Sequence, residues 1–180
     1  KASLREAKSV ISREEAKLEL STSKPKFGKL HPRTENQAKM INLMNEKRLV
    51  FAVGPAGTGR TFCSTSWAVE KLMNDEIERI IITRPMAGCD EDMGFLPGDE
   101  NEKFSVWLDP YMDVLEGKLG KSRVQTLIKF EKIIAKPLMM MRGSTFRNAV
   151  VILDEAQNTT PGQMKMFLTR VGEGTRLIIN

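Results

Sequence analysis

The fold is decided by residues 49–61, which read LVFAVGPAGTGRT. The apolar run Leu49–Val53 predicts a buried strand, and residues 54–61 match the phosphate-loop pattern G-x-x-x-x-G-K-[ST] except that Arg60 replaces the lysine. Glycines let the backbone amides of such a loop curl around phosphate oxygens, and the helix that follows adds free N–H groups and the positive end of its dipole. We therefore expect a phosphate-binding site here rather than a glycine-rich turn without a ligand.

The rest of the chain alternates short apolar runs with longer helical segments. The predicted strands are Leu49–Val53, Ile80–Thr83, Ala149–Leu153 and Leu177–Ile179, with a weaker fifth at Lys132–Ala135. Helices are expected over 34–47, 61–74, 110–130 and 161–171, the last starting at Thr160-Pro161 and stopping at Gly172. Runs rich in β-branched residues suit strands buried in a parallel sheet, and the alternation predicts a doubly wound α/β fold with helices on both faces.

Composition narrows the class of protein. The chain has 180 residues, 41% of them apolar and 28% charged, which suits one compact domain. Its two cysteines, Cys63 and Cys89, fit neither a disulfide scaffold nor a four-ligand zinc site, so we expect a reduced, cytoplasmic setting. No apolar run approaches the roughly 18 residues of a membrane span, and no membrane partner is expected.

Positive charge is concentrated at the start of the chain. Residues 1–50 carry 12 Lys/Arg against 6 Asp/Glu, whereas residues 51–180 carry 16 against 17. We divide the chain into a basic leader and linker over 1–30, with a short helix near 12–20, and a domain over 31–180. The leader either contacts nucleic-acid phosphates or is simply a solvated segment.

Arg60 separates two functional hypotheses. A lysine ammonium is a compact charge, whereas a guanidinium is longer, planar and forked, so the exchange is not conservative. Arg60 can bind a triphosphate by paired hydrogen bonds and still place its charge wrongly for the transition state. Nucleotide binding is therefore expected, and rapid hydrolysis is not.

A pair of carboxylates follows the predicted strand Ala149–Leu153. Asp154 is predicted to hold Mg²⁺ together with the Thr61 hydroxyl, and Glu155 to orient or deprotonate the attacking water. Gln157 is placed to sense the γ-phosphate. Taken alone, the Asp-Glu pair is equally a helix-start signal, because carboxylates favour helix N-termini.

Several motifs together resemble the PhoH-like family over about residues 32–180. These motifs are Gly54–Thr61, Ile81–Pro85, Gly94–Asp99, Met141–Gly143, Val151–Thr160 and Gln163–Arg170. The resemblance implies a P-loop NTPase with a RecA-like core similar to the first domain of superfamily 1 helicases, using ATP and Mg²⁺. The family occurs in bacteria and bacteriophages and is associated with phosphate starvation and RNA metabolism.

The resemblance also implies site residues. Gln37 looks like the glutamine that reads adenine, although it also has the spacing of a capping-box residue after Thr34. Thr83 and Arg84 resemble a helicase motif that meets single-stranded nucleic acid, or are an ordinary strand end. Arg142 is expected to contact phosphate, or is a surface charge. The full predicted nucleotide-binding set is Gln37, Gly54, Pro55, Ala56, Gly57, Thr58, Gly59, Arg60, Thr61 and Phe62.

Differences between this sequence and the family pattern leave two functional hypotheses open. Beyond Arg60, the sequence stops at Asn180, where the family continues into a Gly-Asp sensor loop, so we expect a chain shortened relative to the family. Residues 1–30 are too short for the nuclease domain of some relatives, and no nuclease activity is expected. The first hypothesis is an Mg²⁺-dependent ATPase acting with RNA or single-stranded nucleic acid. The alternative is a nucleotide-binding switch with little hydrolysis.

A ring-shaped homo-oligomer is a third hypothesis, in which Arg142, Arg147 or Arg170 completes the nucleotide site of a neighbouring subunit. Trp107 and Phe104 either stack on bases or pack in the core, and Trp67 is expected to pack.

Overall fold

The computed structural model describes residues 28–85 and 100–180, with side chains from Trp107 onward in the second range. The helices are α2 (Glu35–Glu46), α3 (Arg60–Met73), α4 (Glu100–Leu119), α5 (Lys121–Lys129) and α6 (Pro161–Leu168), with short 3-10 turns η1 (Leu138–Met141) and η2 (Ala156–Asn158). The strands are β1 (Leu49–Phe51), β2 (Arg79–Arg84), β3 (Ile133–Pro137), β4 (Ala149–Leu153) and β5 (Arg176–Ile179). The predicted helix near 12–20, Cys89, the Gly94–Asp99 motif and the Phe104 side chain lie outside the described residues.

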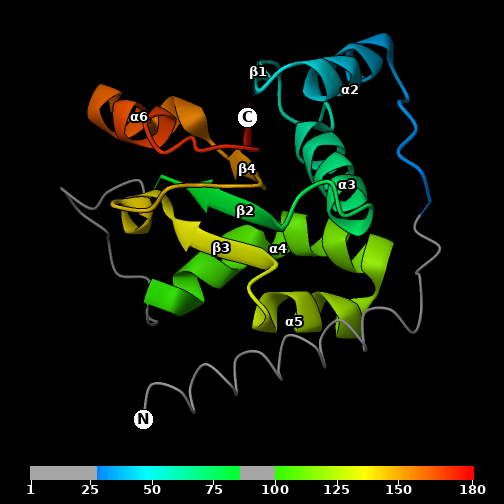
Figure 1. Cartoon of the computed structure of the whole chain (residues 1–180). Coiled ribbons are helices and arrows are strands. Elements are labelled where there is room, and N and C mark those ends of the chain that lie inside the picture. The colour runs from blue at the N-terminus through cyan, green and yellow to red at the C-terminus, as the bar shows by residue number, and fades with distance from the viewer. Residues whose placement is uncertain (1–27, 86–99) are drawn as a thin grey trace.

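The five strands form one parallel sheet in the order β1-β5-β4-β2-β3 (Figure 1). Every neighbouring pair is parallel, with Phe51 opposite Ile179 and Leu153 opposite both Ile179 and Thr83. The predicted α/β class and the weak fifth strand are confirmed. The strand that precedes the phosphate loop and the strand that precedes the carboxylates are thus separated by one strand, β5.

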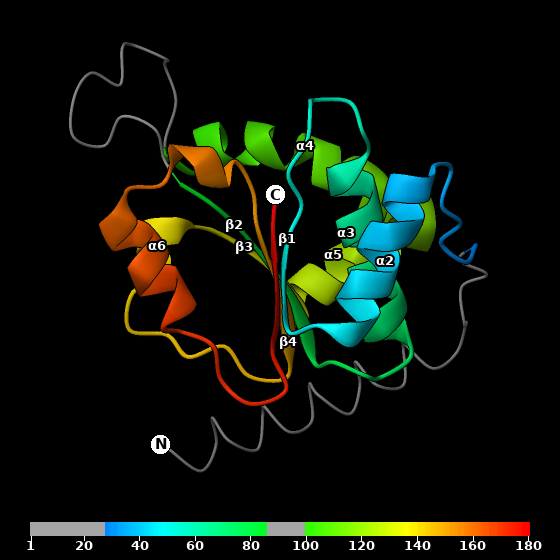
Figure 2. The same cartoon turned by 90° about the horizontal axis from the view of Figure 1, so that it is seen from above.

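Helices cover both faces of the sheet. Figure 2 shows α6 on one side of the strands and α2, α3, α4 and α5 on the other. Successive side chains of a strand point to opposite faces of the sheet, so alternate strand residues pack in two separate hydrophobic cores. Ile80, Ile152 and Ile178 join the core under α3 and α4, whereas Ile81, Val151 and Ile179 join the core under α6.

Two predicted helices have different bounds. The expected helix over 110–130 is two helices, because the chain turns at Gly120, whose φ of 81° suits a residue without Cβ. The expected helix over 161–171 ends at Leu168. Val171 instead pairs with Phe146, and a Cβ on Gly172 would lie 2.3 Å from the Phe146 carbonyl oxygen. This long-range contact takes the chain out of the helix before Gly172.

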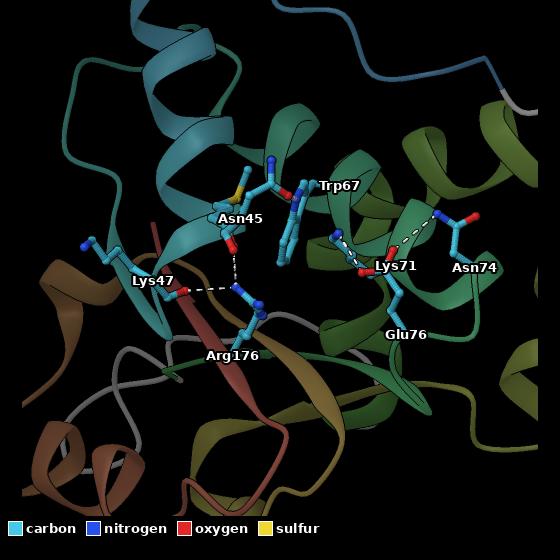
Figure 3. A network of polar contacts seen from close by, with 8 residues as sticks. Asn45, Lys47, Trp67, Lys71, Asn74, Glu76 and Arg176 are labelled. Carbon is cyan, nitrogen blue, oxygen red and sulfur yellow. Dashed lines mark hydrogen bonds and ion pairs between the residues drawn. The ribbon is translucent and has the colours of Figure 1, made fainter.

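A polar network joins α2 to α3 and β5 (Figure 3). The Arg176 guanidinium donates to the carbonyl oxygens of Met44 and Asn45, both at 2.9 Å, at the C-terminal end of α2. It also lies 5.9 Å from the ring centroid of buried Trp67, whose indole Nε1 donates to Asn45 Oδ1 at 2.9 Å. Trp67 is therefore a packing residue, as predicted, and the network fixes α2 against the sheet.

Candidate nucleotide-binding site

The phosphate loop and the carboxylate pair lie at the same edge of the sheet. Both follow parallel strands, β1 and β4, and the carboxyl ends of parallel strands share one edge, where α/β folds bind ligands. Two strand spacings separate β1 from β4, which is about 10 Å. Asp154 follows Ile152 and Asn180 follows Ile178 by two residues, so both side chains face α3 and α4.

The loop has the backbone shape that its glycines predict. Gly57 and Gly59 have φ of 76° and 84°, a region that residues with a Cβ rarely adopt. The Thr58 hydroxyl donates to the Pro55 carbonyl oxygen at 3.0 Å, and α3 begins directly after Gly59. A Cβ on Gly59 would lie 2.9 Å from Gln37 Nε2, so the close approach of Gln37 also requires a glycine here. Because α3 starts at Arg60, the free N–H groups of its first turn lie next to the loop.

Gln37 fastens α2 to the loop. Its Nε2 donates to the Thr58 carbonyl oxygen at 3.1 Å, and its Oε1 accepts from the Arg33 backbone N–H at 2.7 Å. Thr34 caps α2, as predicted, by accepting from the Gln37 backbone N–H at 3.2 Å. The reciprocal half of a capping box is absent from these contacts, because the Gln37 side chain contacts Arg33 and the loop instead. Its position beside the loop is compatible with the predicted reading of adenine.

A hollow of about 890 Å³ opens between α2, β1 and the loop. This volume falls within the range of small-molecule sites. Most of the predicted nucleotide-binding residues line it, including Gln37, Arg60 and Phe62. Phe51, which was not among the predicted site residues, lines the same hollow and is 55% exposed. An aromatic residue on an outward position of an edge strand was the available signal.

Arg60 turns back onto the loop. Its guanidinium donates to the carbonyl oxygen of Gly54, the first residue of the loop. A guanidinium has five N–H donors, so this bond commits one of them to the loop backbone and limits where the others can meet a phosphate. The predicted difference between Arg60 and a lysine is thus seen as a hydrogen bond from the guanidinium to the backbone of the loop.

The carboxylates have different surroundings. Burial raises the pKa of Asp154 above its ordinary value, and the neighbouring Tyr111 hydroxyl and Arg84 partly oppose this. Glu155 has a left-handed backbone with φ of 51°, which turns the chain sharply after β4. Its Oε1 lies 3.9 Å from the Arg84 guanidinium, and its Oε2 accepts from the Gln157 side chain. Both oxygens of Glu155 are thus engaged within the protein.

Two α4 residues reach this edge: Trp107, for which base stacking and packing were both considered, and Tyr111, which was not predicted. Trp107 lies with its ring centroid 5.1 Å from the Arg84 guanidinium. Tyr111, four residues later on the same helical face, is 1% exposed and lies against Asp154, Asn180 and Thr61. Burial raises the pKa of Tyr111, so the phenol stays neutral. The spacing of Trp107 and Tyr111 was readable from the sequence, but the partners of these residues were not.

The predicted nucleic-acid residues differ in accessibility. Thr83 is fully buried, so its side chain is not available to a ligand, whereas the Arg84 side chain is 29% exposed. Arg142 is exposed and follows η1, at the carboxyl edge of the sheet. Arg147 lies just before β4, and the Arg170 Nε donates to the Met166 carbonyl oxygen near the end of α6. These two arginines therefore lie toward the amino-terminal edge of the sheet.

The donor set suits a hard divalent cation. Thr61 offers a hydroxyl and Asp154 a carboxylate, and Mg²⁺ prefers oxygen ligands while keeping several waters. Among the described residues no group of three His, Cys, Asp or Glu side chains is placed to hold a metal ion by itself. Two protein oxygens completed by phosphate oxygens and waters is the pattern that nucleotide sites use for Mg²⁺. The residues present therefore fit this ion.

A sequence model of the family described as PhoH-like protein matches residues 29–180. The chain belongs to the PhoH-like family. It is 49% identical over 150 residues to protein PhoH of Escherichia coli (strain K12), a match that covers 82% of this chain and 42% of the relative. It is 46% identical over 158 residues to a PhoH-like protein of Bacillus subtilis (strain 168), covering 88% of this chain and 50% of the relative.

A PhoH-like protein of Mycobacterium tuberculosis (strain ATCC 25618 / H37Rv) is 41% identical over 150 residues, covering 83% of this chain and 43% of the relative. The chain thus spans half or less of the length of these relatives. The family assignment confirms the resemblance drawn from the motifs and identifies residues 54–61 as part of a P-loop family domain. No helix in residues 28–85 or 100–180 has the length and apolar character to cross a lipid bilayer.

Proposed function

We propose that this chain binds ATP with Mg²⁺ between the loop 54–61 and the carboxylate Asp154, and hydrolyses it slowly. The observation that carries the proposal is that Tyr111 lies against both Thr61 and Asp154, so the hydroxyl and the carboxylate expected to ligate the metal share one small volume. The loop amides and the start of α3 receive the phosphates, and the hollow beside Gln37 receives the nucleoside.

Each residue then has a specific task. Bound Mg²⁺ would neutralise phosphate charge and align the β- and γ-phosphates. Asp154 and Thr61 would hold it, Gln37 would fix the loop by its bond to Thr58, and Glu155 would orient the attacking water. Arg84 and Gln157 contact the two oxygens of Glu155, and each oxygen keeps a lone pair that could accept from the water.

Slow turnover is the expected behaviour of the free chain. Arg60 is folded onto Gly54, and a guanidinium places charge differently from an ammonium. Loss of one well-placed transition-state donor costs about 10²–10³ in rate, so restoring lysine at position 60 should raise turnover by about 100-fold.

Phosphate release by the parent chain, Arg60→Lys and Arg60→Lys/Glu155→Gln tests this proposal. Arg60→Lys should be the fastest of the three, and the double variant should lose the gain because Glu155 orients the water. Equal rates in all three proteins would discard hydrolysis at this site. The nucleotide-binding switch is favoured instead if ATP binds and Arg60→Lys gives no turnover.

We propose RNA or single-stranded nucleic acid as the partner of the Arg84 edge. Arg84 is shared between the Trp107 ring and Glu155, and an incoming phosphate would compete with that carboxylate for the guanidinium. Nucleic acid should therefore stimulate hydrolysis, and binding should weaken with salt because phosphate contacts release counterions. Arg84→Gln should remove the stimulation. Stimulation retained in Arg84→Gln would refute this role, and affinity unchanged between low and high salt would refute phosphate recognition.

We also propose a homo-oligomer, because many RecA-like ATPases complete the site with an arginine from the next subunit, and Arg142, Arg147 or Arg170 could supply it. Light scattering with and without ATP and Mg²⁺ tests it. A monomer in both conditions would exclude a subunit-completed site.

A further inference from the structure

The hydroxyl of Tyr111 is a buried polar group at the carboxyl edge of the sheet. Tyr111 belongs to the main core under α3 and α4 and is 1% exposed. Within residues 28–85 and 100–180, no atom completes a hydrogen bond of good geometry with its hydroxyl oxygen. A buried polar group without a partner destabilises the folded state, so such groups in native proteins usually have a function or a missing partner.

The surroundings of this hydroxyl point to that partner. Thr61, Asp154 and Asn180 come from α3, the end of β4 and the end of β5, and all three side chains act on the Tyr111 phenol. The Asn180 amide donates to Ser64 Oγ at 3.2 Å, and its Oδ1 is a second buried oxygen for which no described residue supplies a hydrogen bond. Two such atoms lie beside a carboxylate and a hydroxyl that are expected to ligate Mg²⁺.

We propose that the Tyr111 hydroxyl is a positioning group for the metal site, which donates to the Asp154 carboxylate. The inference rests on the proposed Mg²⁺-nucleotide binding. Groups that hold a metal-ligating carboxylate fix its orientation, and removing one commonly lowers metal affinity by about 10–100-fold. In this arrangement α4 supports the site through Tyr111 on one side and through Trp107 and Arg84 on the other.

Tyr111→Phe tests the role because it removes the hydroxyl and keeps the buried ring. Nucleotide affinity is measured by calorimetry over a Mg²⁺ titration and again in excess chelator. We expect the Mg²⁺ concentration at half-maximal effect to rise by about tenfold or more, with affinity in chelator unchanged. A structural defect alone would change both affinities together.

Thr65→Val is the matched control. Thr65 is also fully buried, its hydroxyl also lacks a partner among the described residues, and it is not among the groups that act on Asp154. Its Mg²⁺ dependence should equal that of the parent. In an Asp154→Asn background, Tyr111→Phe should have no further effect on the Mg²⁺ titration, because the group that it positions is no longer a carboxylate.

A spectroscopic readout is independent of activity, because Tyr111 is the only tyrosine of the chain. Incorporated 3-fluorotyrosine gives a single ¹⁹F resonance, which should shift with Mg²⁺ and ATP together and not with ATP in chelator. A parent-like Mg²⁺ titration in Tyr111→Phe, or a resonance that ignores Mg²⁺ while the parent binds Mg²⁺-ATP, overturns the role of Tyr111 alone. Absence of any Mg²⁺ dependence in the parent overturns both this inference and the proposed function.

Discussion

Replacing Arg176 should loosen the helix that carries Gln37. Arg176 stands at the start of β5, and its guanidinium NH1 donates to the carbonyl oxygens of Met44, Asn45 and, at 3.4 Å, Lys47. These are carbonyls at the end of α2 that have no partner within the helix. Figure 3 shows the guanidinium between the end of α2 and the Trp67 side chain. Arg176→Met keeps most of the apolar stem and removes the donors and the charge.

The magnitude follows from the contacts. NH1 has two hydrogens, so two good bonds form at a time, and a hydrogen bond from a charged donor contributes about 1.5–3 kcal/mol in favourable cases. Arg176 is half-buried, so we take the lower end, with about 0.5–1 kcal/mol for the contact with the Trp67 ring. The total is about 3.5–4 kcal/mol, which corresponds to a fall in Tm of roughly 7–16 °C for a chain of this size.

Thermal unfolding followed by circular dichroism measures this change. Arg142→Met makes the same chemical change at an exposed site where the side chain has no described bond, and its free energy of unfolding should stay within about 0.5 kcal/mol of the parent. Hydrogen exchange should show lost protection over α2 and retained protection over α6, which lies on the other face of the sheet. A Tm for Arg176→Met equal to that of Arg142→Met would refute the reasoning.

Two further predictions concern the site. Gly59→Ala should lower ATP affinity by about tenfold or more, because its φ of 84° is strained for alanine and the new Cβ would meet Gln37 Nε2 at 2.9 Å. The control Gly117→Ala, in α4 with open space around it, should bind like the parent; equal affinities in both variants would contradict the role of Gln37 and the loop. Burial raises the pKa of Asp154 in the folded chain, so ionising this carboxyl destabilises the fold as the pH rises above that raised pKa. Asp154→Asn cannot ionise and should therefore raise the Tm of the nucleotide-free chain at pH 7. The difference in Tm should disappear as the pH falls to the ordinary range of aspartate, about 3.9, and a lower Tm for Asp154→Asn at pH 7 would be the opposite result.

Much of the fold was predictable because its signals are local. The apolar runs marked all five strands, including the weak one near Lys132–Ala135, and the glycine spacing marked the loop. Helix bounds were predicted less well because long-range contacts decide them. Val171 leaves α6 to pair with Phe146, a residue 25 positions earlier in the sequence. Gly120 gave a readable signal for a break, and only the structure shows that the chain turns there.

The site was predictable in its motifs and not in its support. The order of strands places β5 between β1 and β4, a pairing that no local pattern encodes. Tyr111 reaches Asp154, and Trp107 reaches Arg84, only because α4 lies near the ends of β2 and β4, so an ordinary helical spacing became part of the site. Thr83, chosen by resemblance, is fully buried because it points to the face of the sheet that α6 covers, whereas its neighbour Arg84 points to the other face.

Calorimetry of ATP binding to the parent chain, with Mg²⁺ and then with excess chelator, tests the central claim most directly. We expect binding with Mg²⁺ to be about tenfold tighter or more, and Asp154→Asn to bind Mg²⁺-ATP no better than the parent binds ATP in chelator. No binding heat in either condition, or an Asp154→Asn variant with the full Mg²⁺ effect, would contradict the claim that the loop and the carboxylate grip one magnesium-bound triphosphate.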